Sequence, residues 1–125
     1  MTRHNLFLNL FRDKEGLSFA AGKFVFKAGD PGDAMYIVTE GEVEILDGSG
    51  TLLETAGPGS IVGELALIDD EPRSAAVVAK TDCRLVVVDR RRFEFMVQET
   101  PFFGLAVMKV LADRLRKTNA RIPSN

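Results

Sequence analysis

The stretch KFVFKAGDPGDAMYIVTEGEVEILDGSGTLLETAGPGS, residues 23–60, alternates short apolar segments with turns rich in glycine. The turns fall at residues 29–33, 40–42, 48–50 and 57–59. In EGEVEIL, Val43 and Ile45 alternate with Glu42 and Glu44, which is typical of a strand with one buried and one wet face. Short, evenly spaced strands joined by glycine turns predict an antiparallel sandwich or barrel.

The segments on either side complete a single-domain layout over residues 1–125. SAAVVA and CRLVVVD predict two more strands, so about eight strands accumulate over residues 17–89. Apolar residues at helical spacing predict a short N-terminal helix within residues 1–15, and a renewed helical period predicts two C-terminal helices over residues 90–121. The predicted fold is therefore mostly β with α: an antiparallel, jelly-roll-like β-roll with a few helices. The longer C-terminal helix carries an apolar stripe of Leu105, Met108, Leu111, Ala112 and Leu115.

Composition narrows the classes of function. The 125 residues include 18 acidic and 16 basic side chains, a net charge of -2, so no global charge attracts nucleic acid or anionic lipid. No apolar run approaches the roughly 18 residues of a membrane span, and the start lacks a small-residue cleavage site, which predicts a cytoplasmic protein without a membrane segment. The only cysteine, Cys83, excludes an internal disulfide, and its apolar neighbours predict a buried or half-buried packing residue.

The stretch GELALIDDEPRSAA, residues 63–76, carries the chemistry. ELALI predicts one short helical turn beginning at Gly63, and the first N–H groups of a helix are unpaired donors that suit an anion. A glycine there permits close approach of a ligand. Arg73 supplies paired donors matched to phosphate oxygens, and the small Ser74 and Ala75 leave room for the phosphate. Residues 63–75 therefore predict a phosphate cradle with a short helix.

Glu64 has a different part in this cradle, because a carboxylate repels phosphate. A carboxylate accepts hydrogen bonds and suits a sugar hydroxyl, so Glu64 together with Arg73 describes a ribose phosphate. The alternative from the residues alone is a buried ion pair between Glu64 and Arg73 that ties the short helix to a strand. That alternative leaves the glycine and the small residues unexplained.

GELAL at residues 63–67 and PRSA at residues 72–75 resemble the phosphate-binding cassette of the cyclic nucleotide-binding domain family. AGDPGDAMYIVTEGEVEI, residues 28–45, resembles the β-roll signature of that family, and the likeness extends over roughly residues 15–121. The resemblance implies that Glu64 accepts from the ribose 2′-hydroxyl and that Arg73 pairs with the exocyclic phosphate oxygens. It also implies ligand contacts from other residues of the cassette and the strand before it. From this part of the chain the predicted site contains Val62, in the strand before the cassette, and the cassette residues Gly63, Glu64, Leu65, Arg73, Ser74 and Ala75.

In this family the last helix closes over the base, and the resemblance places Arg114 and Thr118 beside the ligand. For Arg114, solvation or pairing with Asp113 or a neighbouring chain stays open as an alternative. Ser74 directly after Arg73, followed by Ala75, resembles the bacterial cyclic AMP pattern, while a serine hydroxyl also suits guanine. With Thr118 the resemblance favours cyclic AMP as ligand over cyclic GMP. The residues 90–92, three arginines in a row, are expected to form a solvated turn and helix start.

Two rival functions remain. An enzyme on a similar roll typically holds a metal with clustered histidines, whereas this chain has only His4, outside the roll, so neither catalytic nor metal-binding residues are predicted. The second rival is a degenerate family member that docks or dimerises through the stripe around Leu111 and Leu115. The chain stops at Asn125, so no DNA-binding domain is expected in it. The expected partners are a cyclic nucleotide and either a second copy or an unidentified effector protein.

Overall fold

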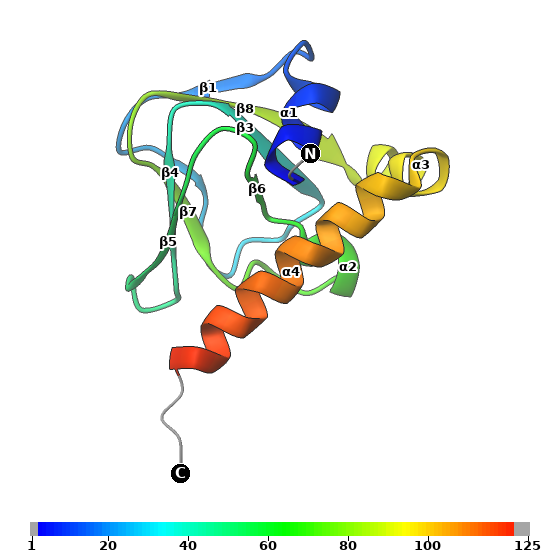
Figure 1. Cartoon of the computed structure of the whole chain (residues 1–125). Helices are drawn as coiled ribbons and strands as arrows, with labels where there is room; N and C mark the ends of the chain where they lie inside the picture. Colours follow the sequence, from blue (N-terminus) through cyan, green and yellow to red (C-terminus); the bar gives the residue numbers. More distant parts are fainter. Residues whose placement is uncertain (1–2, 122–125) are drawn as a thin grey trace.

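The computed structural model describes residues 3–121, and these form eight strands and four helices (Figure 1). In chain order the elements are α1 (Arg3–Phe11), β1 (Leu17–Phe19), β2 (Phe24–Phe26), β3 (Ala34–Glu40), β4 (Val43–Leu46), β5 (Leu52–Ala56), β6 (Ile61–Val62), α2 (Leu65–Asp69), β7 (Ala76–Ala79), β8 (Cys83–Asp89), α3 (Arg90–Glu99) and α4 (Pro101–Arg121). The predicted antiparallel roll of about eight strands, with its short cassette helix and two C-terminal helices, is confirmed.

The strands build two four-stranded antiparallel sheets, in the orders β1-β8-β3-β6 and β2-β7-β4-β5. In β3, Met35 and Ile37 belong to one core cluster, and Val38 belongs to another. The same alternation in β8 divides Val86 from Leu85. The central strands of the first sheet, β3 and β8, are therefore buried on both faces, because one face packs against the second sheet and the other against helices.

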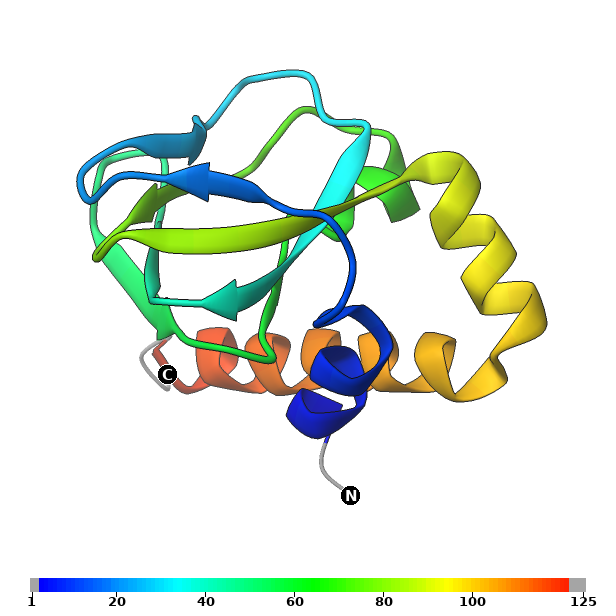
Figure 2. The ribbon, with the colours of Figure 1, turned by 90° about the horizontal axis from the view of Figure 1, so that it is seen from above.

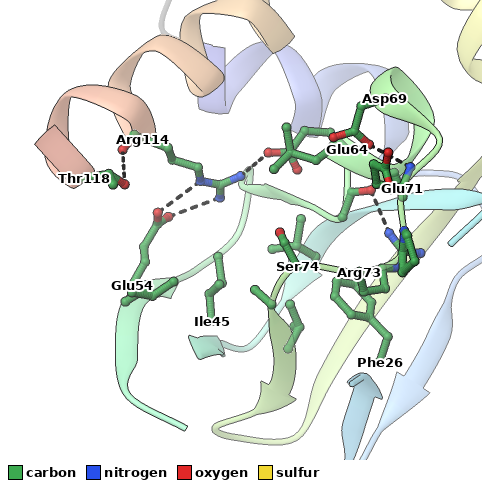
Figure 3. A pocket seen from close by; sticks show the side chains of 18 of the residues that line it. Phe26, Ile45, Glu54, Glu64, Asp69, Glu71, Arg73, Ser74, Arg114 and Thr118 are labelled. Carbon is green, nitrogen blue, oxygen red and sulfur yellow. Dashed lines mark hydrogen bonds and ion pairs between the residues drawn. The ribbon is translucent and has the colours of Figure 1, made fainter. Parts of the chain in front are cut away.

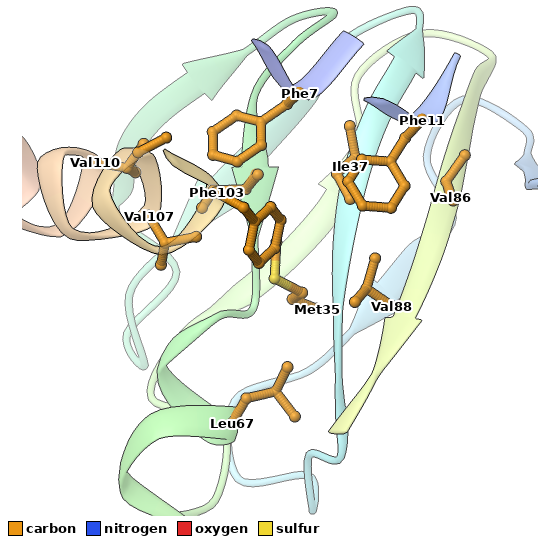
Figure 4. Packing of buried hydrophobic residues seen from close by; sticks show 12 residues of the cluster. Phe7, Phe11, Met35, Ile37, Leu67, Val86, Val88, Phe103, Val107 and Val110 are labelled. Atoms are coloured by element: carbon orange, nitrogen blue, oxygen red, sulfur yellow. The ribbon is translucent and has the colours of Figure 1, made fainter. Parts of the chain in front are cut away.

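The helical layer is held by aromatic side chains (Figure 4). Phe103 of α4 is fully buried, with its ring centroid 5.9 Å from that of Phe7 in an edge-to-face arrangement. Phe11 and Phe93 also lie against it, with ring centroids 6.1 and 5.8 Å away. This packing holds the first half of α4 beneath the roll, and Figure 2 shows the helix running along the roll with α1 beside it.

The end of the first helix differs from the sequence-based expectation. Helix α1 ends at Phe11 rather than at residue 15. The four residues after Phe11 are charged and add nothing to the apolar face of the helix, and the chain turns there. The buried face of α4 consists of Phe103, Ala106, Val107 and Val110. In the predicted stripe, Leu111 is half-buried and the other four residues are exposed. Since α4 is apolar around much of its circumference, its orientation against the roll selects the face that packs.

Cys83 is buried between the two sheets, as predicted. Burial, with the nearby Asp82 carboxylate, raises the pKa of its thiol. Within residues 3–121, no single helix is both long and apolar enough to cross a membrane; by length and composition alone, α3 and α4 qualify only as a pair bent by 113°.

Candidate functional site

A cavity of about 310 Å³ lies where the second sheet, α2 and the C-terminal half of α4 meet (Figure 3). This volume is within the range of small-molecule sites. All nine residues of the predicted site line it, seven from the β6–α2–β7 segment and two, Arg114 and Thr118, from α4. The fold therefore brings together residues from two distant parts of the chain.

Gly63 precedes α2 and has a φ of +80°, a conformation that favours glycine. The helix itself begins at Leu65, so the prediction that it begins at Gly63 is wrong by two residues. A Cβ atom at Gly63 would lie 2.7 Å from Nη1 of Arg73. From the sequence, Gly63 was expected to leave space for a ligand. In the structure, the missing side chain leaves space for the guanidinium of Arg73.

Arg73 is buried, with 7% of its surface exposed. Its Nη1 donates to the Gly63 carbonyl and its Nη2 to the Ala34 carbonyl, both at 2.7 Å, and the guanidinium lies 4.1 Å from the centre of the Phe26 ring. Its Nε is buried and has no hydrogen-bond partner among the described residues. Burial lowers the pKa of Arg73, and no carboxylate of the described residues forms a salt bridge with it. The direct contacts of its guanidinium are therefore neutral groups: two backbone carbonyls and an aromatic ring.

Glu64 is also buried, at 3% exposed. Its Oε1 accepts a hydrogen bond from Nη1 of Arg114 at 2.6 Å. The alternative of a Glu64–Arg73 ion pair is therefore wrong, because Glu64 pairs with α4 and Arg73 binds backbone carbonyls. The two predicted ligand groups line the same cavity without neutralising each other through a salt bridge.

Arg114 reaches from α4 into the roll, between two carboxylates (Figure 3). Besides Glu64, it donates to both oxygens of Glu54, at 3.1 and 3.3 Å, and to the Ile61 carbonyl at 2.7 Å. Burial disfavours its charged form, but the Glu64 and Glu54 carboxylates outweigh burial and raise the pKa of Arg114. In the structure, Arg114 is thus paired inside the cavity wall rather than solvated.

The other predicted side chains are more open. Ser74 and Leu65 are exposed at the mouth of the cavity. The Thr118 hydroxyl is also exposed and donates to the Arg114 carbonyl at 3.0 Å, one turn back along α4. These groups are reachable by a bound molecule.

Ten further residues that line the cavity were not identified by the sequence analysis, and four residues at the site bear on its chemistry. Phe26, Glu54 and Lys117 line the cavity, and Gly32, interpreted there as a turn residue, lies so close to Arg73 that a Cβ atom would be 2.6 Å from its Nε. No local motif marks them, because each meets the site only through the fold. Only the unusual carboxylate in the apolar strand LLETA offered a signal for Glu54.

Arg90 departs from the expected solvated helix start. It donates to the carbonyls of Leu67 and Ala66 and pairs with the Asp70 carboxylate, so it links the end of α2 to the start of α3. Asp70 has a φ of 59° at this helix end. Among the described residues, no group of three or more potential metal-binding side chains comes together.

Comparisons with known proteins agree with this geometry. The family model described as "Cyclic nucleotide-binding domain" matches residues 17–100. The CRP-like cAMP-activated global transcriptional regulator of Mycobacterium tuberculosis is 35% identical over 114 residues, which cover 88% of this chain and 51% of that protein. The cAMP-dependent protein kinase regulatory subunit of Emericella nidulans is 40% identical over 79 residues, which cover 62% of this chain and 19% of that protein.

Among solved structures, the Thermus thermophilus Catabolite Activator Protein superposes with a TM-score of 0.77 at 30% identity, covering 94% of this chain and 56% of that one. These matches confirm the resemblance carried by the two sequence motifs. The chain spans about half the length, or less, of these relatives.

Proposed function

The chain belongs to the cyclic nucleotide-binding domain family, and from that premise we propose that it binds cyclic AMP in the cavity beside α2. In this proposal the domain is a regulatory sensor whose helix α4 closes over the ligand. The regulatory relatives named above support the sensor role.

The observation that carries the proposal is the state of Arg73. The guanidinium is buried and bonded directly only to neutral groups, so its burial disfavours the charged form, which the nearby Asp33, Glu64 and Asp30 carboxylates only partly offset. An anionic ligand bound directly to it stabilises that charge. Its backbone carbonyl partners and the Phe26 ring orient it on the cavity wall. The proposed ligand group at Arg73 is the exocyclic phosphate, with Ser74 and the amide of Ala75 completing its shell.

Glu64 supports the ribose end of the proposal. Its Oε1 is occupied by Arg114, and no donor from the described residues reaches Oε2. A carboxylate oxygen on the wall of a small-molecule cavity suits a hydroxyl donor, which in a ribose cyclic phosphate is the 2′-hydroxyl. The Gly63 and Leu65 amides and the Val62 side chain then lie beside the sugar and phosphate.

The base is assigned to the α4 side, where Arg114 and Thr118 line the cavity. A ligand that contacts both the roll and α4 binds better when α4 is closed, so it shifts the population toward the closed state by at most its difference in affinity for the two states. The exposed Thr118 hydroxyl and the cyclic AMP-related names of the relatives favour adenine. The cytoplasmic location of the protein stays a prediction.

The test is a calorimetric titration of the purified, nucleotide-free chain with cyclic AMP, cyclic GMP and 5′-AMP. The proposal expects micromolar or tighter binding of cyclic AMP, weaker binding of cyclic GMP, and much weaker binding of the ring-opened 5′-AMP. Tighter binding of cyclic GMP would correct the base assignment alone. No heat with any of the three from a folded sample would overturn the proposal and favour the docking function.

A further inference from the structure

Besides Glu64, three carboxylate residues line the cavity: Glu54, Asp69 and Glu71. Of these, Glu54 is the one bonded to Arg114, and the proposed function gives it no role. Glu54 lies on β5, and its side chain is 24% exposed. Both of its oxygens accept from Arg114: Oε1 from Nε at 3.1 Å and Oε2 from Nη2 at 3.3 Å. Two parallel hydrogen bonds along one edge of a guanidinium fix the plane of the group as well as its position.

The rest of the Arg114 guanidinium is committed by this arrangement. Nη2 also donates to the Ile61 carbonyl, and Nη1 donates to Oε1 of Glu64. All three nitrogens are used, so the long arginine side chain has one orientation in which every partner is satisfied. Glu54 supplies the contacts on one edge and thereby decides which nitrogen faces Glu64.

The consequence reaches Glu64. Its side chain is only 4% exposed, and Arg114 neutralises and orients it through Oε1 alone. Its other oxygen is then aimed by the same contact, because the two oxygens of a carboxylate move together. A fixed acceptor loses little conformational entropy when a ligand donates to it, whereas a mobile one loses more.

Resting on the proposed function, we propose that Glu54 is a positioning residue that sets how strongly the site prefers cyclic nucleotides with a ribose 2′-hydroxyl over those without one. Glu54 acts through Arg114 and Glu64 rather than by touching the ligand. Without it, the freed edge of Arg114 turns toward another acceptor, and Glu64 loses the partner geometry that aims its carboxylate.

A purely electrostatic effect of Glu54 predicts something different. Removing a negative charge near an anionic ligand strengthens the binding of every cyclic nucleotide by a similar factor. The ratio of affinities for cyclic AMP and 2′-deoxy cyclic AMP cancels that factor, since both ligands carry the same charge. A change in the ratio therefore reports the positioning of Glu64, whereas the change in electrostatic potential caused by the substitution leaves the ratio unchanged.

The experiment measures both affinities by calorimetry for the wild-type chain, Glu54→Gln and Glu54→Ala. The nearly isosteric glutamine variant protects the test against misfolding of the alanine variant. Glu44→Gln is the matched control, because Glu44 lies on the neighbouring strand β4, pairs in register with Thr55, and is outside the cavity lining.

We expect the wild type and Glu44→Gln to bind cyclic AMP about tenfold or more tightly than the 2′-deoxy compound, since the missing hydroxyl leaves Oε2 of the buried Glu64 without a donor. In both Glu54 variants this ratio should fall at least threefold. A ratio within twofold of wild type in the folded Glu54→Gln variant overturns the inference, as does a wild-type ratio near one. The proposed function fails separately, if the wild type binds neither nucleotide.

Discussion

Two arginines line the same cavity and are held in opposite ways. Arg73, between the roll and α2, binds backbone carbonyls and an aromatic ring and forms no salt bridge within the described residues. Arg114, on α4, is bonded to two carboxylates and a carbonyl. The two arginines therefore differ in whether a carboxylate is bonded directly to the guanidinium, and an anionic ligand is expected where none is.

The same comparison separates two tasks. The Arg73 side keeps a charge that the ligand completes, so substitutions there act mainly on binding. The Arg114 side has its charges completed by the protein, so substitutions there act mainly on how α4 is held against the roll. The following predictions test that division, from the largest expected effect to the smallest.

Arg73→Ala should weaken cyclic AMP binding by roughly 2 to 5 kcal/mol, because the phosphate loses its charge-assisted partner. Calorimetric titration checks this, with circular dichroism to verify folding. Arg116→Ala is the control, since it removes the same charge from an exposed position on α4 outside the cavity lining. Arg73→Lys, which keeps the charge without the fork, should lose less. Unchanged binding by a folded Arg73→Ala variant would show that the ligand phosphate does not bind at Arg73.

Gly63→Ala should lower the free energy of unfolding by about 1–3 kcal/mol, because a Cβ atom is strained at a φ of +80° and meets Arg73 at 2.7 Å. Urea unfolding measures the effect. Gly50→Ala is the matched control, since Gly50 has a similar φ of +90° and a Cβ atom there meets nothing within 4 Å. Equal stability of the two variants would mean that Arg73 has room to move away.

Arg114→Met should lower the unfolding free energy by about 1–2 kcal/mol at pH 7, because it leaves Glu54 and Glu64 without their shared cation. Urea unfolding of both proteins at pH 7 measures the loss. Arg114→Lys, which keeps the positive charge without the planar guanidinium, should lose less. An equal loss in the two variants would show that the charge of Arg114 contributes nothing to stability.

The smallest effect is expected at Cys83, which lies in the core between the sheets and in a different part of the molecule from the two arginines. Its thiol pKa is raised in the folded protein, so the folded state keeps its proton longer and stability falls as the pH rises above about 8.5, the unfolded value. Cys83→Ala lacks this slope. The stability gap between wild type and variant should therefore narrow by less than about 1 kcal/mol between pH 7 and 10, as followed by urea unfolding. A gap that widens would contradict the direction of the shift.

The sequence predicted the parts of the site that are encoded locally. Gly63, Glu64 and Arg73 stand in two short motifs whose spacing carries the chemistry, and all three line the cavity. Glycine turns and alternating residues likewise predicted the strands of the roll, because period and turn chemistry are properties of neighbouring residues.

The remaining features depend on contacts between distant segments. Phe26 contacts Arg73, and Glu54 binds Arg114, only once β2, β5 and α4 have packed together. No local pattern identifies Phe26, and the carboxylate within LLETA marks Glu54 as unusual without indicating its partner. The buried face of α4 was ambiguous for the same reason: Leu105 and Met108 are as apolar as Val107, and the position of the roll decides between them. The sequence also allowed a Glu64–Arg73 ion pair, because the partner of Glu64 is Arg114, which lies 50 residues further along the chain.

The most direct test of the central claim is a crystal structure of the chain with cyclic AMP. The account predicts phosphate oxygens within hydrogen-bond distance of Arg73, the ribose 2′-hydroxyl on Glu64, and Arg114 still between Glu54 and Glu64. A phosphate bound to Arg114, with Arg73 still bonded only to its carbonyls, would contradict the division between the two arginines.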